Sequence, residues 1–175
     1  MADKGLILLY TGNGKGKTTA ALGQALRAAG HGFNITIIQF IKNQQHTGEI
    51  KAAKEILADH LEIHPMGTGF TWDAKDPEEV RQAALQGWEL ARQKIAGGRY
   101  KMVILDELTY TLNYGLVDED EVLNFLKEKP AGVHIVITGR DASDRLIDIA
   151  DLVTEMQEIK HPYQNGGKAV KGIEF

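Results

Sequence analysis

The sequence contains no cysteine. This absence excludes disulfide bonds, thiolate metal ligands and a cysteine nucleophile. Long apolar runs are missing too, because stretches such as GLILLY and ITIIQFI are far shorter than the roughly 18 residues that a membrane-spanning helix needs. No signal peptide precedes the first apolar stretch, so we expect a cytoplasmic protein.

Long basic runs are also absent, and 24 acidic residues against 20 basic ones give a net charge of -4. We therefore do not expect duplex nucleic acid as a partner, because its phosphates are bound by clustered Lys and Arg side chains. The 175 residues are 43% hydrophobic and 25% charged. This length and composition predict a single domain over residues 1–175, with residues 157–175 as a C-terminal tail.

Short apolar segments alternate with helical patterns along the chain. The helical patterns include one from about Lys17 to Ala29 and one that begins after Asp76 and ends at Gly97. Such alternation predicts an α/β fold with a mostly parallel sheet flanked by helices. The predicted strands are residues 5–11, 34–40, 61–66, 101–106 and 132–138, with 151–156 as a weaker sixth.

Two helix starts carry capping signals. Asp76 with Glu79, and Asp118 with Glu121, have the spacing of a capping box, in which each side chain bonds the backbone N–H of the other residue. In the first of these helices apolar residues recur at helical spacing, and we assign Trp88 among them to the core.

The stretch TGNGKGKTT, residues 11–19, lies between the first predicted strand and the first predicted helix. The phosphate-binding pattern G-x-x-x-x-G-K-[ST] would place its first glycine at position 11, where this chain has Thr11. Glycines let backbone N–H groups surround phosphate oxygens, and the helix N-terminus adds its dipole. The alternative is a strand-to-helix turn without a ligand. We predict that these residues bind a triphosphate: Gly12, Asn13, Gly14, Lys15, Gly16, Lys17, Thr18 and Thr19.

Two further segments follow buried strands and are expected at the same edge of the sheet as this loop. Asp106 and Glu107 end the stretch VILDE, and at least one of them is predicted to hold Mg²⁺ opposite the Thr18 hydroxyl. Arg140, in TGR, either stabilises phosphate charge or pairs with the neighbouring Asp141 and Asp144. Together these residues indicate a nucleoside triphosphate site with Mg²⁺, which kinases, ATPases and switches share.

A glycine-containing loop, MGTGFTWD at residues 66–73, presents Phe70 and Trp72 near this edge. Core packing is the usual role of such rings. Two rings in one short loop favour instead a flat, largely apolar ligand, or a lid over one.

The segments GNGKGKTTAA, QFIK, GTGFTW, LDELTY, TGR and KHPYQNGGKAVKGIEF together resemble the ATP:corrinoid adenosyltransferases of the CobA/BtuR/CobO type, from Gly5 to Phe175. The resemblance implies a P-loop NTPase-like, RecA-like fold. It implies transfer of the 5′-deoxyadenosyl group of ATP to the Co(I) of cobalamin or another corrinoid, with release of inorganic triphosphate. It also implies Mg²⁺ or Mn²⁺, an electron donor such as reduced flavodoxin or flavin, and a homodimer.

The resemblance assigns roles to individual residues. Residues 13–19 would bind the triphosphate of a reversed ATP, and Arg27 and Arg140 would contact the nucleotide. Lys17 and Arg140 would act catalytically by stabilising charge on the leaving phosphate, since cobalt is the nucleophile. Glu107, rather than Asp106, would ligate the metal directly. Phe70 and Trp72 would pack under the corrin ring and displace the lower ligand of Co(II).

Two alternatives remain open at this point. One is a P-loop phosphotransferase or NTPase that produces ADP, and the other is a non-catalytic carrier of nucleotide or corrinoid. Family members of the enterobacterial type carry a helical extension before the first strand, whereas Gly5 is the fifth residue here. We therefore expect either that the corrinoid is bound more loosely or that the C-terminal tail shields it.

Overall fold

The computed structural model describes residues 4–42, 47–55, 57–69 and 76–173. All six predicted strands and both long predicted helices are present. In chain order the elements are β1 (Ile7–Thr11), α1 (Lys17–Gly30), β2 (Ile35–Gln39), α2 (Gly48–Glu55), β3 (Leu61–Pro65), α3 (Pro77–Ala96), β4 (Met102–Asp106), α4 (Leu108–Asn113), α5 (Glu119–Lys127), β5 (His134–Thr138), α6 (Asp144–Ile149), β6 (Leu152–Glu155) and the 3₁₀ helix η2 (Pro162–Asn165).

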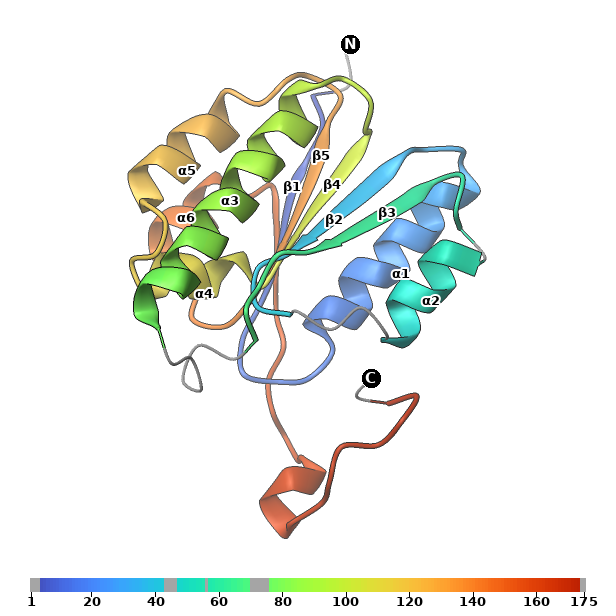
Figure 1. Ribbon diagram of the computed structural model, residues 1–175, viewed down its shortest axis with the longest axis vertical. Coiled ribbons are helices and arrows are strands. Elements are labelled where there is room, and N and C mark those ends of the chain that lie inside the picture. Colours follow the sequence, from blue (N-terminus) through green and yellow to red (C-terminus); the bar gives the residue numbers. More distant parts are fainter. Residues whose placement is uncertain (1–3, 43–46, 56, 70–75, 174–175) are drawn as a thin grey trace.

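The six strands form one sheet in the order β3-β2-β4-β5-β1-β6, and every neighbouring pair is parallel. Helices α1 and α2 cover one face, and α3, α4, α5 and α6 cover the other (Figure 1). Each connection between parallel strands must cross a face of the sheet, which is why the helices divide into two layers. The predicted α/β class is confirmed.

The core lies in two apolar clusters, one on each face of the sheet. The larger cluster joins the strands to α3 and α5, and the smaller one packs α1 against the other face. Every residue of β2 and β4 is buried, as expected for central strands covered on both sides. The helical repeat of α3 is confirmed, since Val80, Ala84, Trp88, Ala91 and Ile95 are all buried.

The predicted helix caps are formed with two differences. Asp76 accepts its hydrogen bond from the backbone N–H of Glu78 at 2.9 Å, one residue earlier than the predicted partner Glu79. Asp118 accepts from the Glu121 N–H at 3.0 Å, as predicted. The Glu121 side chain, however, accepts from Trp88 Nε1 at 2.9 Å. This carboxylate therefore ties α5 to the buried indole of α3 and does not complete the box.

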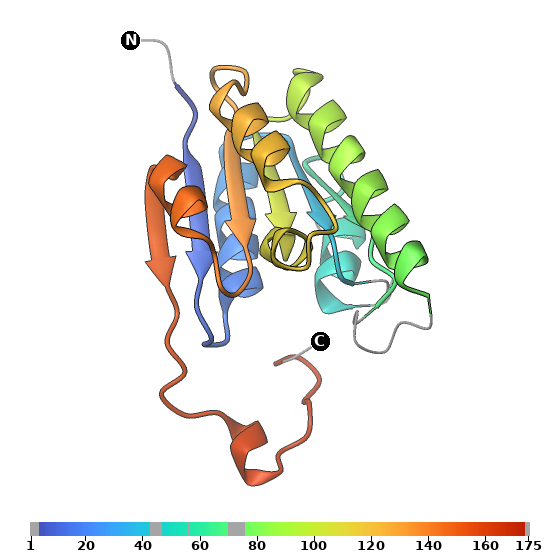
Figure 2. The ribbon, with the colours of Figure 1, turned by 90° about the vertical axis from the view of Figure 1, so that its left-hand side faces the viewer.

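The carboxyl ends of the strands meet at one edge of the sheet. The chain leaves β6 there and continues as the C-terminal tail, which passes beneath that edge (Figure 2). In the part of the chain that the structure describes, no helix has both the length and the apolar character needed to cross a bilayer.

Candidate active site

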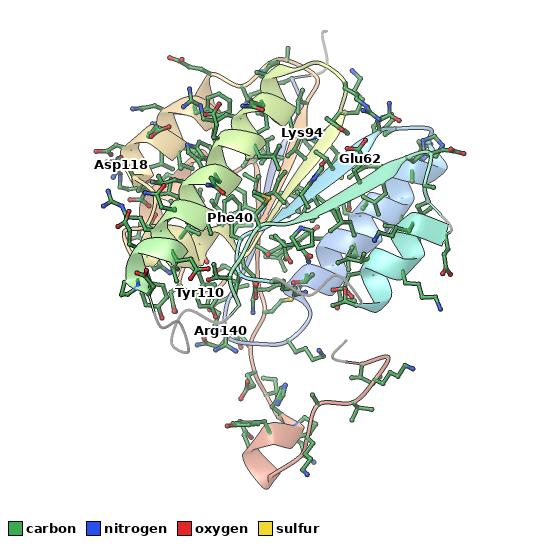
Figure 3. All side chains as sticks on the ribbon, in the orientation of Figure 1. Phe40, Glu62, Lys94, Tyr110, Asp118 and Arg140 are labelled. Carbon is green, nitrogen blue, oxygen red and sulfur yellow. The ribbon has the colours of Figure 1, made fainter. Side chains whose placement is uncertain are left out.

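A cavity of about 660 Å³ opens at the carboxyl edge of the sheet. Figure 3 shows Tyr110 and Arg140 at this edge, while Glu62 and Lys94 lie at the opposite end of the sheet. The segments that follow β1, β2, β4 and β5 contribute to the wall, and so does the tail. The described lining residues are Lys15, Gly16, Lys17, Thr18, Thr19, Leu22, Lys42, Gly48, Glu49, Glu107, Tyr110, Thr138, Gly139, Arg140, Gly172 and Ile173.

The glycine loop between β1 and α1 is braced by the backbone that follows β6. The Gly14 N–H donates to the carbonyl of Met156 at 2.6 Å. A Cβ atom on Gly14 would lie 2.7 Å from the Gln157 carbonyl oxygen, a distance that real Cβ atoms do not reach. The Lys17 ammonium donates to the carbonyls of Gly12 and Gly14, both at 2.7 Å. The loop therefore has a fixed shape without a ligand.

Position 11, where the phosphate-binding pattern has its first glycine, carries a buried threonine. The Thr11 hydroxyl accepts a hydrogen bond from the Ala142 N–H at 3.3 Å, which ties the end of β1 to the segment after β5. Gly12 follows with a φ of 91°, a left-handed conformation that favours glycine. The turn toward α1 therefore starts one residue later than in the standard loop.

Cationic residues from several segments line the cavity. Burial lowers the pKa of Lys17, and the nearby Arg140 guanidinium lowers it further, while Glu107 and Asp141 act in the opposite sense. Burial also lowers the pKa of Lys42, but the carboxylates of Asp106 and Glu49 outweigh it and raise this pKa above its ordinary value. Lys17 and Arg140 thus repel one another in the free protein, and a bound anion would relieve that repulsion.

Asp106 lies beneath the cavity at the end of β4 and is 1% exposed. Its Oδ1 accepts hydrogen bonds from the hydroxyls of Thr18 at 2.8 Å and Thr138 at 2.7 Å. Its Oδ2 accepts from Gln39 Nε2 at 3.1 Å. Three donors hold this carboxylate in place, so it fixes the first turn of α1 relative to β2 and β5.

Glu107 is held in an unusual backbone conformation, with a φ of 64°. Its N–H donates to the Thr138 hydroxyl at 2.9 Å. Among the residues that the structure describes, its Oε2 is buried and has no hydrogen-bond partner. Burial, together with the Asp106 carboxylate, raises the pKa of Glu107 to about 7. This carboxyl therefore occupies a place where a positive charge would stabilise its ionised form.

Arg140 follows β5 and is fixed through its backbone. Its carbonyl accepts hydrogen bonds from the Thr109 hydroxyl at 2.7 Å and from Asn113 Nδ2 at 3.3 Å, so α4 sets its position. Its side chain borders the main cavity and also a second hollow of about 590 Å³, to which Asn13 contributes.

The structure brings most of the predicted site residues together. Seven of them line the main cavity: Lys15, Gly16, Lys17, Thr18, Thr19, Glu107 and Arg140. The others have different positions. Asp106 bonds Thr18 from below, Gly12 and Gly14 bond Lys17, and Asn13 lines the second hollow.

Arg27 is not among the described residues that line the cavity. It lies in the last turn of α1, where its guanidinium donates to Gln24 at 3.2 Å. It is ten positions after Lys17 in the same helix, a rise of about 15 Å along the axis. Phe70 and Trp72, the predicted corrinoid-binding pair, lie outside the described residues.

Sequence reasoning missed several lining residues. Lys42 pairs with Glu49 of α2 at 3.1 Å and lies 3.9 Å from Asp106. Its place at the end of QFIK, directly after β2, was a usable signal, because β2 ends at the same edge as the loop. Tyr110 and Ile173 had no comparable signal, since isolated apolar residues are usually assigned to packing.

Comparison with known proteins shows the family to which the chain belongs. A family model described as ATP:corrinoid adenosyltransferase BtuR/CobO/CobP matches residues 3–175. The chain belongs to this family. It is 44% identical to a corrinoid adenosyltransferase of Sinorhizobium sp., over 99% of this chain and 81% of the relative. It is 40% identical to the corrinoid adenosyltransferases of Escherichia coli K12 and Salmonella typhimurium, over 99% of this chain and 87% of each relative.

The chain also has a structural neighbour that is named for a different role. The flagellar accessory protein FlaH from Methanocaldococcus jannaschii superposes with a TM-score of 0.51 at 13% sequence identity, covering 89% of this chain and 72% of FlaH. At that identity the likeness concerns the fold alone. It supports the predicted α/β architecture with a parallel sheet flanked by helices.

Proposed function

We propose that this chain transfers the 5′-deoxyadenosyl group of ATP to the Co(I) of cobalamin or another corrinoid and releases inorganic triphosphate. The observation that carries the proposal is the convergence of Lys17 and Arg140 on one cavity in a member of this family. The corrinoid is a substrate here, and its reduced cobalt is the nucleophile.

The reaction breaks one bond and forms one. The electron pair of Co(I) attacks C5′ of the ribose, the C5′–O bond breaks, and its electron pair stays on the α-phosphate oxygen of the departing triphosphate. Lys17 and Arg140 would stabilise the charge that develops on that oxygen, because both cations are held at the cavity before the reaction begins. No side chain needs to remove a proton.

The shape of the loop supports a reversed nucleotide. A phosphotransferase must leave the γ-phosphorus open to in-line attack. Here the γ-phosphate would instead be the inert end of the leaving group, which a loop braced by Thr11 and by the backbone at Met156 can hold. C5′ would then point away from the loop, toward the corrin.

The donor set fits a divalent cation such as Mg²⁺ or Mn²⁺. Thr18, Asp106 and Glu107 supply only oxygen donors, and the buried Glu107 Oε2 is unpaired among the described residues. Among the described residues, we find no cluster of three or more His, Asp or Glu side chains that could hold a metal ion. Phosphate oxygens of the bound nucleotide would therefore complete the coordination shell of the cation. The cation would supply positive charge to the triphosphate, and Glu107 is the proposed direct ligand.

Phe70 and Trp72 remain the proposed corrinoid-binding pair. If they displace the lower ligand from Co(II), replacing either by Ala will spare transfer from chemically generated Co(I) and reduce transfer from Co(II) with a reductase. Both reactions should be followed by the corrin absorption spectrum. Equal loss in the two assays would contradict ligand displacement.

A reduced flavodoxin or flavin is the proposed electron donor, a homodimer the proposed assembly and the cytoplasm the proposed location. Arg27 bears on the assembly, because it is not among the described residues that line the cavity. We place it in the site of a partner protomer. Light scattering at assay concentration tests for the dimer, and a monomer that retains full activity would remove this role for Arg27.

The deciding experiment is an anaerobic assay with MgATP and reduced cobalamin, with separation of the phosphate products. Adenosylcobalamin together with intact triphosphate is the expected result. ADP and phosphate with an unchanged corrin spectrum would establish the alternative, a P-loop NTPase. Binding of ATP without any reaction would indicate the other alternative, a non-catalytic carrier.

A further inference from the structure

The C-terminal strap, residues 157–173, reaches the cavity without belonging to either apolar cluster of the core. The hydrogen bonds described for residues 158–173 join residues of this same segment. Examples are Gln164 Nε2 to Glu158 at 2.6 Å, and Gly167 N to the Pro162 carbonyl at 3.0 Å. The strap is thus folded on itself, and it lies beneath the strand ends (Figure 2).

The end of the strap turns back toward the sheet. Gly172 has a φ of 82°, a conformation that side-chain-bearing residues rarely adopt. The Ile173 N–H closes the turn by donating to the Val170 carbonyl at 3.1 Å. Gly172 and Ile173 consequently line the same cavity as Lys17 and Arg140.

Ile173 differs from most of the wall that it joins. The loop side of the cavity is lined by Lys15 and Lys17, whose positive charges suit phosphates. Among the described lining residues, those with large apolar side chains are Leu22 of α1, Tyr110 of α4 and Ile173. The Ile173 side chain is 64% exposed in the free protein, so it has apolar surface left to bury.

A nucleoside triphosphate held by the loop presents the complementary chemistry. Its phosphates occupy the polar wall, and its base and ribose carbons need an apolar one. We propose that Ile173 positions the nucleoside, with the strap closing over the cavity so that this side chain packs against the base or ribose of bound ATP. The inference rests on the proposed function, in which the same ATP is the adenosyl donor.

The test distinguishes the contribution of the nucleoside to binding from that of the phosphates. Binding of MgATP and of inorganic triphosphate is measured by calorimetry for the wild type and for Ile173→Ala, without corrinoid. Affinity for ATP should fall about five- to tenfold, because partly buried apolar contacts are lost. Affinity for inorganic triphosphate should stay within about twofold, since that ligand lacks the nucleoside. In turnover, KM for ATP should rise while kcat at saturating ATP changes little.

Two variants serve as controls. Ile173→Leu keeps an apolar side chain of similar size and should restore ATP affinity. Val170→Ala truncates another exposed apolar side chain of the strap, 56% exposed and outside the cavity lining, and should leave both ligands unaffected.

Unchanged ATP affinity in Ile173→Ala would overturn the inference, and so would an equal loss for ATP and triphosphate. Neither result would touch the proposed function, which depends on the products that the wild type forms. Conversely, ADP formation by the wild type would refute the proposed function while the affinity comparison could still be made.

Discussion

The glycine loop and the C-terminal strap border the same cavity but are held in different ways. The loop is fixed by the backbone at Met156, and Thr18 beside it is anchored to the buried Asp106. The strap carries large exposed apolar residues, among them Ile159 at 88% and Tyr163 at 79%. In the proposed function, charge is recognised by a loop held within the folded domain, and the nucleoside is recognised by a segment that adds little to the core.

The largest effect is expected at the loop. Lys17→Ala should lower kcat/KM for transfer by about 10²- to 10³-fold, because the developing charge on the leaving triphosphate loses a fixed cation. The rate of adenosylcobalamin formation from Co(I) measures this. Lys101→Ala removes the same charge at the opposite end of the sheet and should have no effect. Normal turnover of the Lys17 variant would refute the triphosphate assignment.

The brace behind the loop can be broken separately. Gly14→Ala should lower the free energy of unfolding by about 2 kcal/mol, because the added methyl group meets the Gln157 carbonyl and the loop must shift. Gly23→Ala is the matched control at an exposed position of α1, where an added Cβ has no atom within 4 Å. That change should stabilise by about 0.5–1 kcal/mol. Denaturant titration gives both values, and a Gly14 variant as stable as the wild type would disprove the brace.

The Glu107 carboxyl should make the free energy of unfolding depend on pH. Its folded pKa of about 7 lies above the ordinary 4.5, so the metal-free protein should lose stability as pH rises through this interval. Glu107→Gln should abolish that loss and stabilise the protein at pH 8 by about 2 kcal/mol, less than the full shift implies because part of the group is open to solvent. At pH 4.5 the two proteins should be nearly equal. Unfolding measured in a chelator across this range checks the prediction, and parallel curves would contradict it.

The smallest effect on stability is expected from the strap. A chain that ends at Gln157 should unfold within about 0.5 kcal/mol of the full chain, because residues 158–173 belong to neither core cluster. The same truncation should weaken ATP binding at least as much as Ile173→Ala does. A large fall in the midpoint of denaturant unfolding would show that the strap and the rest of the domain unfold as one cooperative unit.

The fold could be predicted from the sequence because its signals are local. Continuous apolar runs such as KMVILD are typical of strands covered on both faces, and the recurrence of Val80, Ala84, Trp88, Ala91 and Ile95 defines the buried face of α3. The short helices α2, α4 and α6 were missed. Six to eight residues give too few turns for a periodic pattern to be recognised.

The sequence predicted that the segments after β1, β4 and β5 meet at one edge, and the structure brings Lys17, Glu107 and Arg140 together there. Their roles in binding and catalysis stay predictions. The rest depends on contacts between distant segments, which no local pattern encodes. Glu121 illustrates this limit, since its spacing indicates a cap whereas Trp88 takes its side chain. Arg27 illustrates another, because the family resemblance assigns it to the nucleotide while it lies in the last turn of α1, away from the helix N-terminus that borders the cavity.

The hydrogen bond from Gly14 to the Met156 carbonyl also bears on how this enzyme can be re-engineered. A backbone carbonyl is available whatever side chain stands at position 156, so the contact leaves almost no signature in the sequence and puts little restriction on residue choice there. Tails of different composition can therefore be grafted after this point while the loop keeps its shape. With the proposed role of Ile173, such grafts should change affinity for the nucleoside without changing the loop that holds the phosphates.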